Sequence, residues 1–130
     1  MHRVFISHTN DSRDYARNLE VALKRFPDFA FVDQSDIGAD ESNSVSIRTR
    51  LQASDTIVVL LTQPAAESPG VLFEIGAAVG LGKRVLPVLM DELDTDKIDY
   101  LIRDQQYLDA RRLTPTETAQ RIRDVTASNK

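Results

Sequence analysis

A single acid within a long apolar segment is the residue of this sequence best placed to do chemistry. The segment from Pro69 to Gly82 reads PGVLFEIGAAVGLG, and Glu74 is its only polar side chain. A carboxylate there needs a reason, because glutamate is almost never fully buried without a partner. It can form a structural salt bridge or face solvent, or it can lie at the rim of a pocket that raises its pKa. The residues alone leave both interpretations open.

Four glycines share this segment with the acid, and three of them, Gly76, Gly80 and Gly82, follow it. A glycine inside a helix costs about 1 kcal/mol relative to alanine. We therefore expect the glycines to allow close approach of a helix to a sheet. The pair Gly82-Lys83 does not make a phosphate-binding loop, because the preceding glycine spacing differs and Arg84 replaces the serine or threonine of that motif.

Two polar residues, Ser7 and His8, end the first apolar run of the chain. A Ser/His/Asp triad with Asp33 is excluded, because adjacent residues of a strand point to opposite faces. The histidines show no spacing to other metal ligands, so we expect neither a metal nor a bound cofactor. A contact of His8 with a ligand and a spectator role both remain open.

Short apolar runs alternate with helical patterns, which indicates parallel strands joined by helices. The pattern predicts an α/β fold of the flavodoxin-like, doubly wound kind: a five-stranded, mostly parallel sheet with helices on both faces. Strands are expected at residues 3–7, 29–33, 56–62, 84–89 and 106–109, and helices at 11–25, 44–52, 68–81 and 114–126. Pro87 cannot donate to a ladder and is expected near an edge or a bulge. In such folds ligands bind outside the carboxyl ends of the strands, at the topological switch point.

Bulk properties limit the class of protein. The 130 residues fit one domain, spanning 1–130. The absence of cysteine excludes disulfides and a thiol nucleophile, and a net charge of −4 disfavours nucleic acid as a partner. Neither a signal peptide nor a segment long enough for a bilayer is visible, so we expect no membrane association and a cytoplasmic location.

Four motifs resemble those of TIR (Toll/interleukin-1 receptor) domains of the bacterial type. Val4-Phe-Ile-Ser-His8 is similar to the family's first strand, and Leu51-Gln-Ala-Ser-Asp55 to the entry of its central strand. Phe31-Val-Asp33 through Asp36-Ile-Gly38 resembles its second strand and the BB loop. Ser68 and Glu74 match the ends of the family pattern S-x-W-C-x-x-E, but the tryptophan and cysteine positions are Gly70 and Val71.

The resemblance implies an NAD+ glycohydrolase or cyclase that cleaves the nicotinamide–ribose bond, with Glu74 as the catalytic residue and a role in bacterial immune signalling. NAD+ would be the substrate, with no separate cofactor. The resemblance also implies a homo-oligomer, or assembly with other TIR domains, through the BB loop. The residues expected to bind substrate are Phe5, Ser7, His8, Asp33, Asp36, Ile37, Gly38, Ser68 and Phe73. Because the chain has no tryptophan, the ring that stacks on the substrate must come from elsewhere, and Phe5 and Phe73 are the alternatives.

Two other functions remain open. One is a TIR module without activity that works by self-association. The other follows from the segment Pro69 to Lys83, which also resembles the corresponding helix of nucleoside 2-deoxyribosyltransferases. In both enzyme families the resemblance assigns Glu74 to chemistry at a sugar C1.

Overall fold

Five parallel strands form one sheet, in the order β2-β1-β3-β4-β5. The structure is a computed structural model and describes residues 2–31, 44–93 and 106–128. The strands are β1 (His2–Ser7), β2 (Phe29–Phe31), β3 (Thr56–Leu61), β4 (Arg84–Leu89) and β5 (Leu108–Asp109). The helices are the 3₁₀ turn η1 (Asn10–Ser12), α1 (Arg13–Leu23), α2 (Ser44–Ala53), α3 (Gln63–Ala66), α4 (Pro69–Gly80) and α6 (Pro115–Ser128). This arrangement confirms the flavodoxin-like, doubly wound fold.

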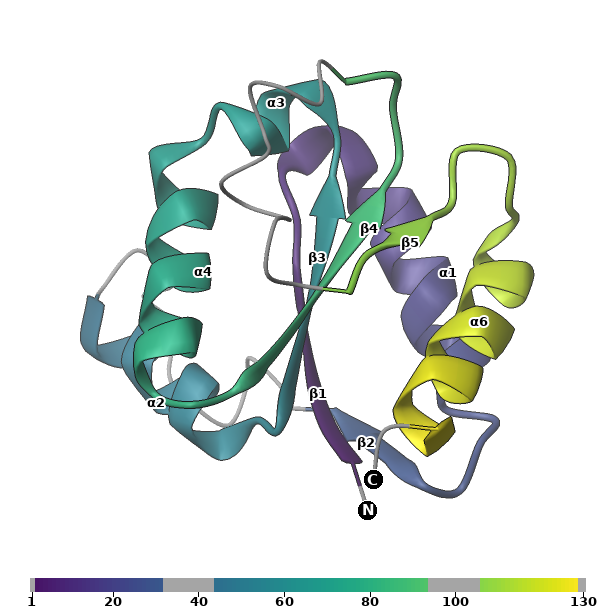
Figure 1. Cartoon of the computed structure of the whole chain (residues 1–130), viewed down its shortest axis with the longest axis horizontal. Helices are drawn as coiled ribbons and strands as arrows, with labels where there is room; N and C mark the ends of the chain where they lie inside the picture. Colours follow the sequence, from purple (N-terminus) through teal and green to yellow (C-terminus); the bar gives the residue numbers. More distant parts are fainter. Residues whose placement is uncertain (1, 32–43, 94–105, 129–130) are drawn as a thin grey trace.

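The order of the strands places the topological switch between β1 and β3. From β1 the chain passes to β2 on one side, and from β3 it passes to β4 and β5 on the other. Helices α2 and α4 cover one face of the sheet, and α1 and α6 cover the other, as Figure 1 shows. In folds of this kind the crevice outside the carboxyl ends of the two central strands is where ligands bind.

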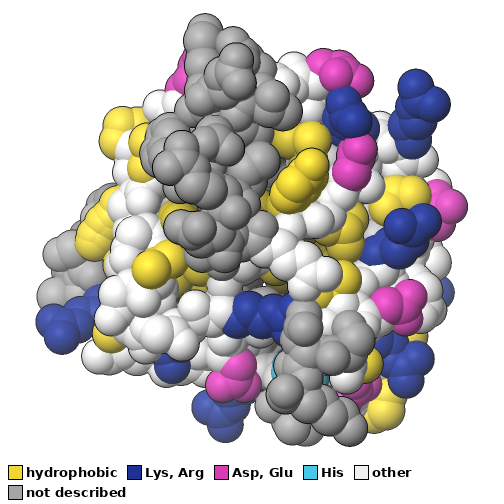
Figure 2. All heavy atoms as spheres, viewed as in Figure 1, with side chains coloured by type: hydrophobic (Ala, Val, Ile, Leu, Met, Phe, Trp, Pro, Cys, Tyr) yellow, Lys and Arg dark blue, Asp and Glu magenta, His cyan; other side chains and the backbone are white. Residues whose placement is uncertain are grey.

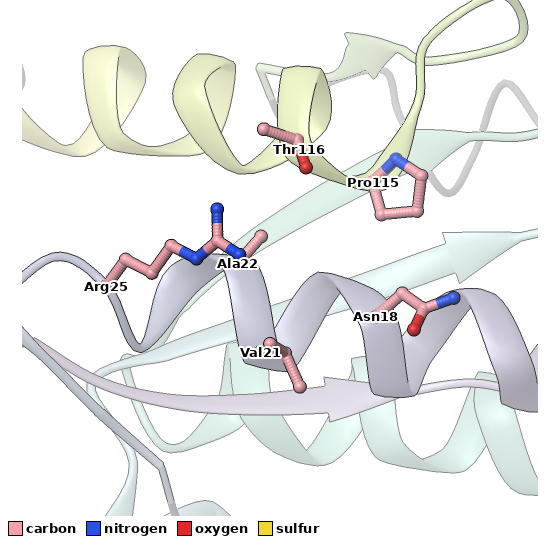
Figure 3. A pocket seen from close by; sticks show the side chains of 6 residues that line it. All are labelled: Asn18, Val21, Ala22, Arg25, Pro115 and Thr116. Atoms are coloured by element: carbon pink, nitrogen blue, oxygen red, sulfur yellow. The ribbon is translucent and has the colours of Figure 1, made fainter.

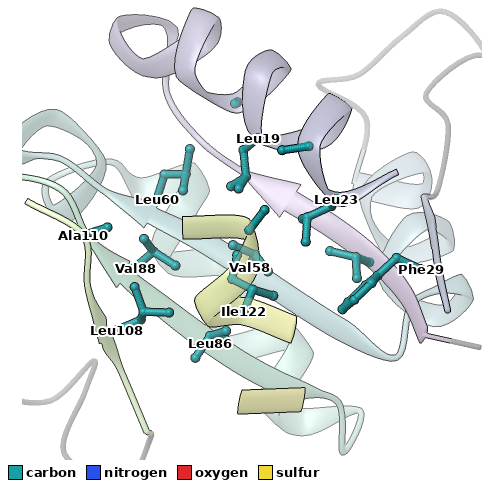
Figure 4. Packing of buried hydrophobic residues seen from close by; sticks show 14 residues of the cluster. Leu19, Leu23, Phe29, Val58, Leu60, Leu86, Val88, Leu108, Ala110 and Ile122 are labelled. Carbon is teal, nitrogen blue, oxygen red and sulfur yellow. The ribbon is translucent and has the colours of Figure 1, made fainter. Parts of the chain in front are cut away.

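The central strand β3 is buried on both faces, as its unbroken apolar sequence predicts. Val58 and Leu60 belong to the core under α1 and α6, whereas Ile57, Val59 and Leu61 belong to the core under α2 and α4. Figure 4 shows the first of these cores, with Ile122 of α6 packed against the strands. Because neighbouring residues of a strand point to opposite faces, the same rule divides the residues of β1 between the two layers.

Proline in β4 fits because of its position in the ladder. The amides of Arg84 and Met90 donate to backbone carbonyls on the β3 side, at 3.1 and 3.0 Å. Even-numbered amides of β4 therefore face β3, and Pro87 faces the opposite side. There, among the described residues, β5 pairs only with Val88 and Leu89. The missing N–H thus interrupts no ladder, and the prediction of Pro87 near an edge is confirmed.

Two predictions about helices were wrong. No helix is predicted directly after β3, yet α3 forms there, with the Thr62 side chain accepting a hydrogen bond from the Ala65 amide as its cap. The first helix was predicted to begin at Asp11, but a 3₁₀ turn occupies Asn10–Ser12 and α1 begins at Arg13. None of the helices within the described ranges combines the length and hydropathy that a membrane crossing requires.

Candidate functional site

Helix α4 positions Glu74, and the start of this helix is fixed by the local sequence Ser68-Pro69. The Ser68 hydroxyl oxygen accepts a hydrogen bond from the Val71 amide at 3.3 Å, and Pro69 occupies the first turn, where its lack of an N–H costs nothing. Ser68, predicted to bind substrate, thus caps the helix that carries the acid. Glu74 follows in the second turn, and α4 packs against β3, β4 and α2.

Glu74 meets the last residue of β1. The Ser7 hydroxyl donates a hydrogen bond to Glu74 Oε1 across 3.2 Å. Ser7 is 2% exposed, whereas the Glu74 side chain is only half-buried. The acid therefore sits over the carboxyl end of β1, beside the switch point, with part of its surface open. Ser7 and Glu74 are both predicted site residues, and the structure brings them together.

A buried arginine lies in the same layer. Arg50, near the end of α2, is 6% exposed, and its guanidinium carbon lies 5.0 Å from the centre of the Phe5 ring. Phe5 and Ser7 are two residues apart on β1 and so share one face of the sheet. The guanidinium and the Glu74 carboxylate therefore lie over the same strip of β1. Arg50 is not among the predicted site residues, because nothing in the sequence distinguishes it from Arg48 of the same segment.

Opposing influences act on the acid. Burial raises the pKa of Glu74, and this is the largest effect; the hydrogen bond from Ser7 and the charge of Arg50 lower it, but the pKa remains above its ordinary value. Desolvation disfavours the charged form, while a donor and a cation favour it. The result is a carboxyl group whose charge is sensitive to its surroundings, as expected for a group that acts in acid–base or charge-stabilising chemistry.

Polar groups also follow β1 beyond the acid. His8 Nδ1 lies 3.1 Å from the Thr9 carbonyl oxygen, and the Thr9 hydroxyl donates to Asp11. The Thr9 hydroxyl lies 3.4 Å from that of Thr62, which follows β3. The hydrogen bond from Thr9 is the main reason that the pKa of Asp11 is lowered. Small hydroxyl groups and the exposed carboxylate of Asp11 therefore gather beyond the carboxyl ends of β1 and β3.

The two aromatic residues proposed to stack on a substrate lie in different surroundings. Phe5 is 7% exposed, belongs to the core under α2 and α4, and has the Arg50 guanidinium over its ring. Little of the Phe5 ring is therefore open to a substrate, and its role in stacking stays a prediction. Phe73 is 45% exposed, but as the neighbour of Glu74 it points about 100° away around the helix axis. The other residues predicted to bind substrate, Asp33, Asp36, Ile37 and Gly38, lie outside the described residues.

A family model described as "TIR domain" matches residues 4–125. The chain belongs to the TIR domain family. This confirms the resemblance inferred from the β1 motif and from the Ser68 and Glu74 pair. No curated protein matches the sequence.

Solved structures with the same fold include both receptor domains and an enzyme. The TIR domain of the Toll-related receptor TRR-2 from Hydra magnipapillata superposes with a TM-score of 0.71, at 16% identity, over 97% of this chain and 99% of that one. The CMP N-glycosidase BcmB of Clostridium botulinum has a TM-score of 0.69, at 16% identity, over 95% and 98%. The TIR domains of the activated Roq1 resistosome, which recognises the pathogen effector XopQ, have a TM-score of 0.58, at 14% identity, over 99% and 74%. At such identities these likenesses show the fold alone.

The outer face of α4 in this TIR domain carries no charge. Its exposed residues include Phe73, Val79, Gly76 and Gly80. Figure 2 shows the flank occupied by α4 in yellow and white, while most visible charged side chains gather on the flank of α1 and α6. A Cβ added to Gly76 or Gly80 would meet nothing within 4 Å. The expectation that these glycines allow close contact with the sheet was therefore wrong, since they face outward.

An open groove of about 310 Å³ lies between α1 and α6, on the face of the sheet opposite to Glu74. Figure 3 shows its lining, with Val21 and Asn18 from α1 and Pro115 and Thr116 from α6. Glu74 is not among the residues that line it. In the part of the chain that the structure describes, no three or more acidic or histidine side chains are grouped so that they could hold a metal ion.

Proposed function

We propose that this TIR domain cleaves the bond between nicotinamide and ribose in NAD+, with Glu74 as the catalytic carboxylate. The observation that carries the proposal is the position of Glu74, half-buried at the switch point and bonded to Ser7 across 3.2 Å. Ligands of doubly wound sheets bind in this crevice. Membership of the TIR family adds the expectation, stated from the sequence, that this glutamate acts on NAD+.

The reaction needs little more than a well-placed negative charge. The bond between the ribose C1′ and the pyridinium nitrogen breaks, and its electron pair leaves with the nitrogen, so that nicotinamide departs as a neutral molecule. Positive charge develops on the ribose, and an anionic Glu74 stabilises this oxocarbenium character, as carboxylates do in glycoside hydrolysis. Water then adds to C1′ and loses a proton, which yields ADP-ribose. If a nitrogen of the same molecule adds to C1′ instead, the product is cyclic.

Ser7 is assigned a supporting role in this proposal. Its hydroxyl donates to one carboxylate oxygen and thereby favours the anion that the reaction requires. Because Ser7 is buried at the end of a central strand, its hydroxyl is held in place by the sheet. Glu74 Oε1 is thus fixed, and the second carboxylate oxygen is the one left to face a ribose.

A second candidate keeps the chemistry and changes the substrate. The name of the similar BcmB structure is that of an N-glycosidase of CMP, a nucleotide whose base is also joined to C1′ of a sugar. Cytosine and adenine leave as anions unless they are protonated, so such a substrate would require an acid as well as a carboxylate. Nucleoside deoxyribosyl transfer belongs to the same class. NAD+ needs no such acid, because its nicotinamide leaves as a neutral molecule, and this favours NAD+ over the two alternatives.

The immune role and self-association remain part of the proposal. The similar Roq1 structure is that of the TIR domains of an activated resistosome that recognises a pathogen effector, and a similar role in defence would place this domain within an oligomer. The BB-loop residues Asp36, Ile37 and Gly38 are the proposed contacts. Substitution Ile37→Asp should then lower the mass of the assembly measured by light scattering. Unchanged assembly in that variant would count against the BB loop.

The test is a product analysis with matched variants. Purified protein is incubated with NAD+, both dilute and crowded, and the products are separated by chromatography. Glu74→Gln should lower nicotinamide release by about 100-fold or more. Glu67→Gln removes an exposed acid that accepts a bond from Gln63, and should leave the rate unchanged.

Parallel incubations separate the alternatives. CMP alone tests for release of cytosine, and a deoxynucleoside with free adenine tests for base exchange. Nicotinamide release by wild type that persists in a folded Glu74→Gln protein would overturn the assignment of Glu74. No product from any substrate, in the dilute and in the crowded sample, would leave the domain as an interaction module.

A further inference from the structure

We propose that two copies of this chain associate through the outer face of α4, with the two helices antiparallel about a two-fold axis. The partner is a second copy of the same chain. The contact uses neither Glu74 nor the BB-loop residues, so it goes beyond the proposed function and does not depend on it.

The outer face of α4 leaves an unusual amount of apolar side chain in solvent. Five large apolar side chains are exposed among the described residues, and three of them lie on α4 or directly after it: Phe73, Val79 and Leu81, at 45, 51 and 38%. Every exposed residue of α4 is nonpolar, whereas a solvated helix carries polar residues opposite its buried face. Exposed apolar surface without charge, with an aromatic ring in it, is typical of the centre of a protein interface.

The spacing along this face provides a ring and a place to receive it. Pro69, Phe73, Gly76 and Gly80 follow one another at i, i+4, i+7 and i+11, which aligns them in a single stripe along the helix. A Cβ at Gly76 or Gly80 would meet no atom within 4 Å, so the stripe is open beside the Phe73 ring. Small residues also let two helix axes approach closely. The stripe can therefore pack against its own copy, with each ring over a glycine of the other.

The charge distribution favours a second copy as the partner. In a two-fold contact the residues near the axis meet their own equivalents, so a charge there would face a like charge. The chain has a net charge of −4, which makes two copies repel each other on average. The uncharged face of α4 is where two copies can meet without opposing like charges.

The two ends of α4 favour the antiparallel arrangement. The exposed acid Glu67 directly precedes the helix region, and Lys83 follows it. Antiparallel helices bring Glu67 of one copy to the end where Lys83 of the other lies, whereas parallel helices would bring like charges together. The Lys83 ammonium donates to the Gln52 carbonyl oxygen at 3.2 Å and has two further N–H groups for such a pair. Pairs of this exposed kind add little affinity but determine the orientation.

One register satisfies both the packing and the charges. An axis between Gly76 and Ala77 places Phe73 of each copy opposite Gly80 of the other, because both positions lie equally far from the axis. In that register Glu67 and Lys83 of the second copy differ by about three residues, or about 5 Å, along the helix direction. Long side chains span that distance.

The size of the contact sets its strength. Helix α4 has 12 residues and is about 18 Å long. A single helix pair of this length buries less than the roughly 1,200 Å² of the smallest stable interfaces. We therefore expect association only at high concentration, so stability measured in dilute samples describes the single copy.

A pair of opposite charges at Gly76 tests the contact. Position 76 lies beside the axis, has open space around it, and favours lysine or glutamate over glycine as part of a helix. Sedimentation is measured from about 10 µM to about 1 mM, the range of weak association. Wild type should shift from monomer to dimer, Gly76→Lys and Gly76→Glu should each weaken the dimer by about 10-fold or more, and their equimolar mixture should restore it. Val21→Lys, at an exposed apolar position of α1, should behave as wild type.

Cross-linking tests the direction of the helices, because the chain has no cysteine of its own. Under mild oxidation Gly76→Cys should form a disulfide dimer. Phe73→Cys should not, since antiparallel helices hold the two copies of position 73 about 10 Å apart along their axes, beyond the reach of a disulfide. Cross-linking of Phe73→Cys or Val21→Cys as fast as Gly76→Cys contradicts the antiparallel contact.

Several outcomes overturn the proposal. A wild-type protein that stays monomeric at about 1 mM, or a dimer that ignores both charges at Gly76, shows that a different partner covers α4. A dimer that is lost in Ile37→Asp and kept in Gly76→Lys shows that copies meet through the BB loop instead. None of these measurements uses NAD+, so a failure to consume NAD+ rejects the proposed function and leaves the contact standing.

Discussion

The hydroxyl of Ser7 donates to Oε1 of Glu74 across 3.2 Å, although 67 positions separate the two residues in the sequence. The contact joins the end of a central strand to the second turn of a helix that starts two strands later. A serine hydroxyl can donate only if the oxygen it meets is an acceptor, and an ionised carboxylate is the stronger acceptor. The contact is therefore strongest in the charge state that the proposed reaction uses.

Removing this donor should change the pH dependence of the reaction. In Ser7→Ala the carboxylate loses its hydrogen bond while burial still opposes its charge, so the pKa of Glu74 should rise further. Activity that needs the anion is lost as pH falls through that pKa, so the acid limb of the kcat profile should move to higher pH. Rates of nicotinamide release between pH 5 and pH 9 measure this shift.

The matched control removes a buried hydroxyl elsewhere. Ser12 donates to the Thr9 carbonyl oxygen and does not contact Glu74. Both alanine variants should lose roughly 1 kcal/mol of unfolding free energy, as expected for one net hydrogen bond. Only Ser7→Ala should move the acid limb. If Ser12→Ala moves it by the same amount, a general loss of stability explains the effect and the contact has no special role.

The free energy of unfolding should also depend on pH because the pKa of Glu74 is raised. A carboxyl group whose folded pKa lies above its unfolded value binds protons more tightly when folded, so its contribution to stability falls as pH rises through that interval. Glu74→Gln removes this penalty, and its unfolding free energy near pH 7 should exceed that of wild type by on the order of 1 kcal/mol, the size common for single stabilising changes. Urea denaturation at several pH values should show the difference shrinking toward pH 4. A variant less stable than wild type near pH 7 would contradict this account.

The parts of the fold that could be predicted are those governed by local rules. The apolar run Thr56–Leu61 is long enough to mark a central strand, and Ser68-Pro69 marks a helix start whatever the rest of the chain does. Glu74 stands out for a similar reason, as the only polar side chain in its segment. These signals require no knowledge of what packs against what.

Other features depend on contacts between distant segments. Nothing local distinguishes Arg50 from the exposed Arg48 of the same helix; its burial follows from Phe5, which meets α2 only after the sheet has formed. The direction of Gly76 is hidden for a different reason. A helix apolar on nearly all sides carries no periodicity that identifies its buried face, so packing against the sheet and facing outward fit the sequence equally well.

The hydrogen bonds between α1 and α6, in the layer opposite the site, should contribute to the stability of the fold. Tyr15 donates to the Leu113 carbonyl oxygen at 3.1 Å and lies 2.6 Å from the buried Thr118 hydroxyl, which ties α1 to α6. Tyr15→Phe should cost about 1 kcal/mol of unfolding free energy, because the Thr118 hydroxyl loses its partner. Tyr107→Phe, at an exposed position, should change stability by less than about 0.5 kcal/mol. Equal losses in the two variants, measured by urea denaturation, would show that the inter-helix bond adds nothing.

Because Gly76 faces outward, we predict the opposite of what the sequence suggests, namely that a larger residue is tolerated there. A methyl group at Gly76 meets no atom within 4 Å, and the residue lies in the interior of α4 with no positive φ. Gly76→Ala should therefore raise the unfolding free energy by up to about 1 kcal/mol, because alanine favours the helix and restricts the unfolded chain. Gly82 provides the opposite case. Its φ of +73° lies in the left-handed region, so Gly82→Ala should lower the unfolding free energy by about 1 kcal/mol, in spite of the open space around it. Thermal and urea denaturation of both variants measure the two signs. A destabilised Gly76→Ala would mean that another surface closes on α4 in solution, and that the uncharged face of this helix is covered.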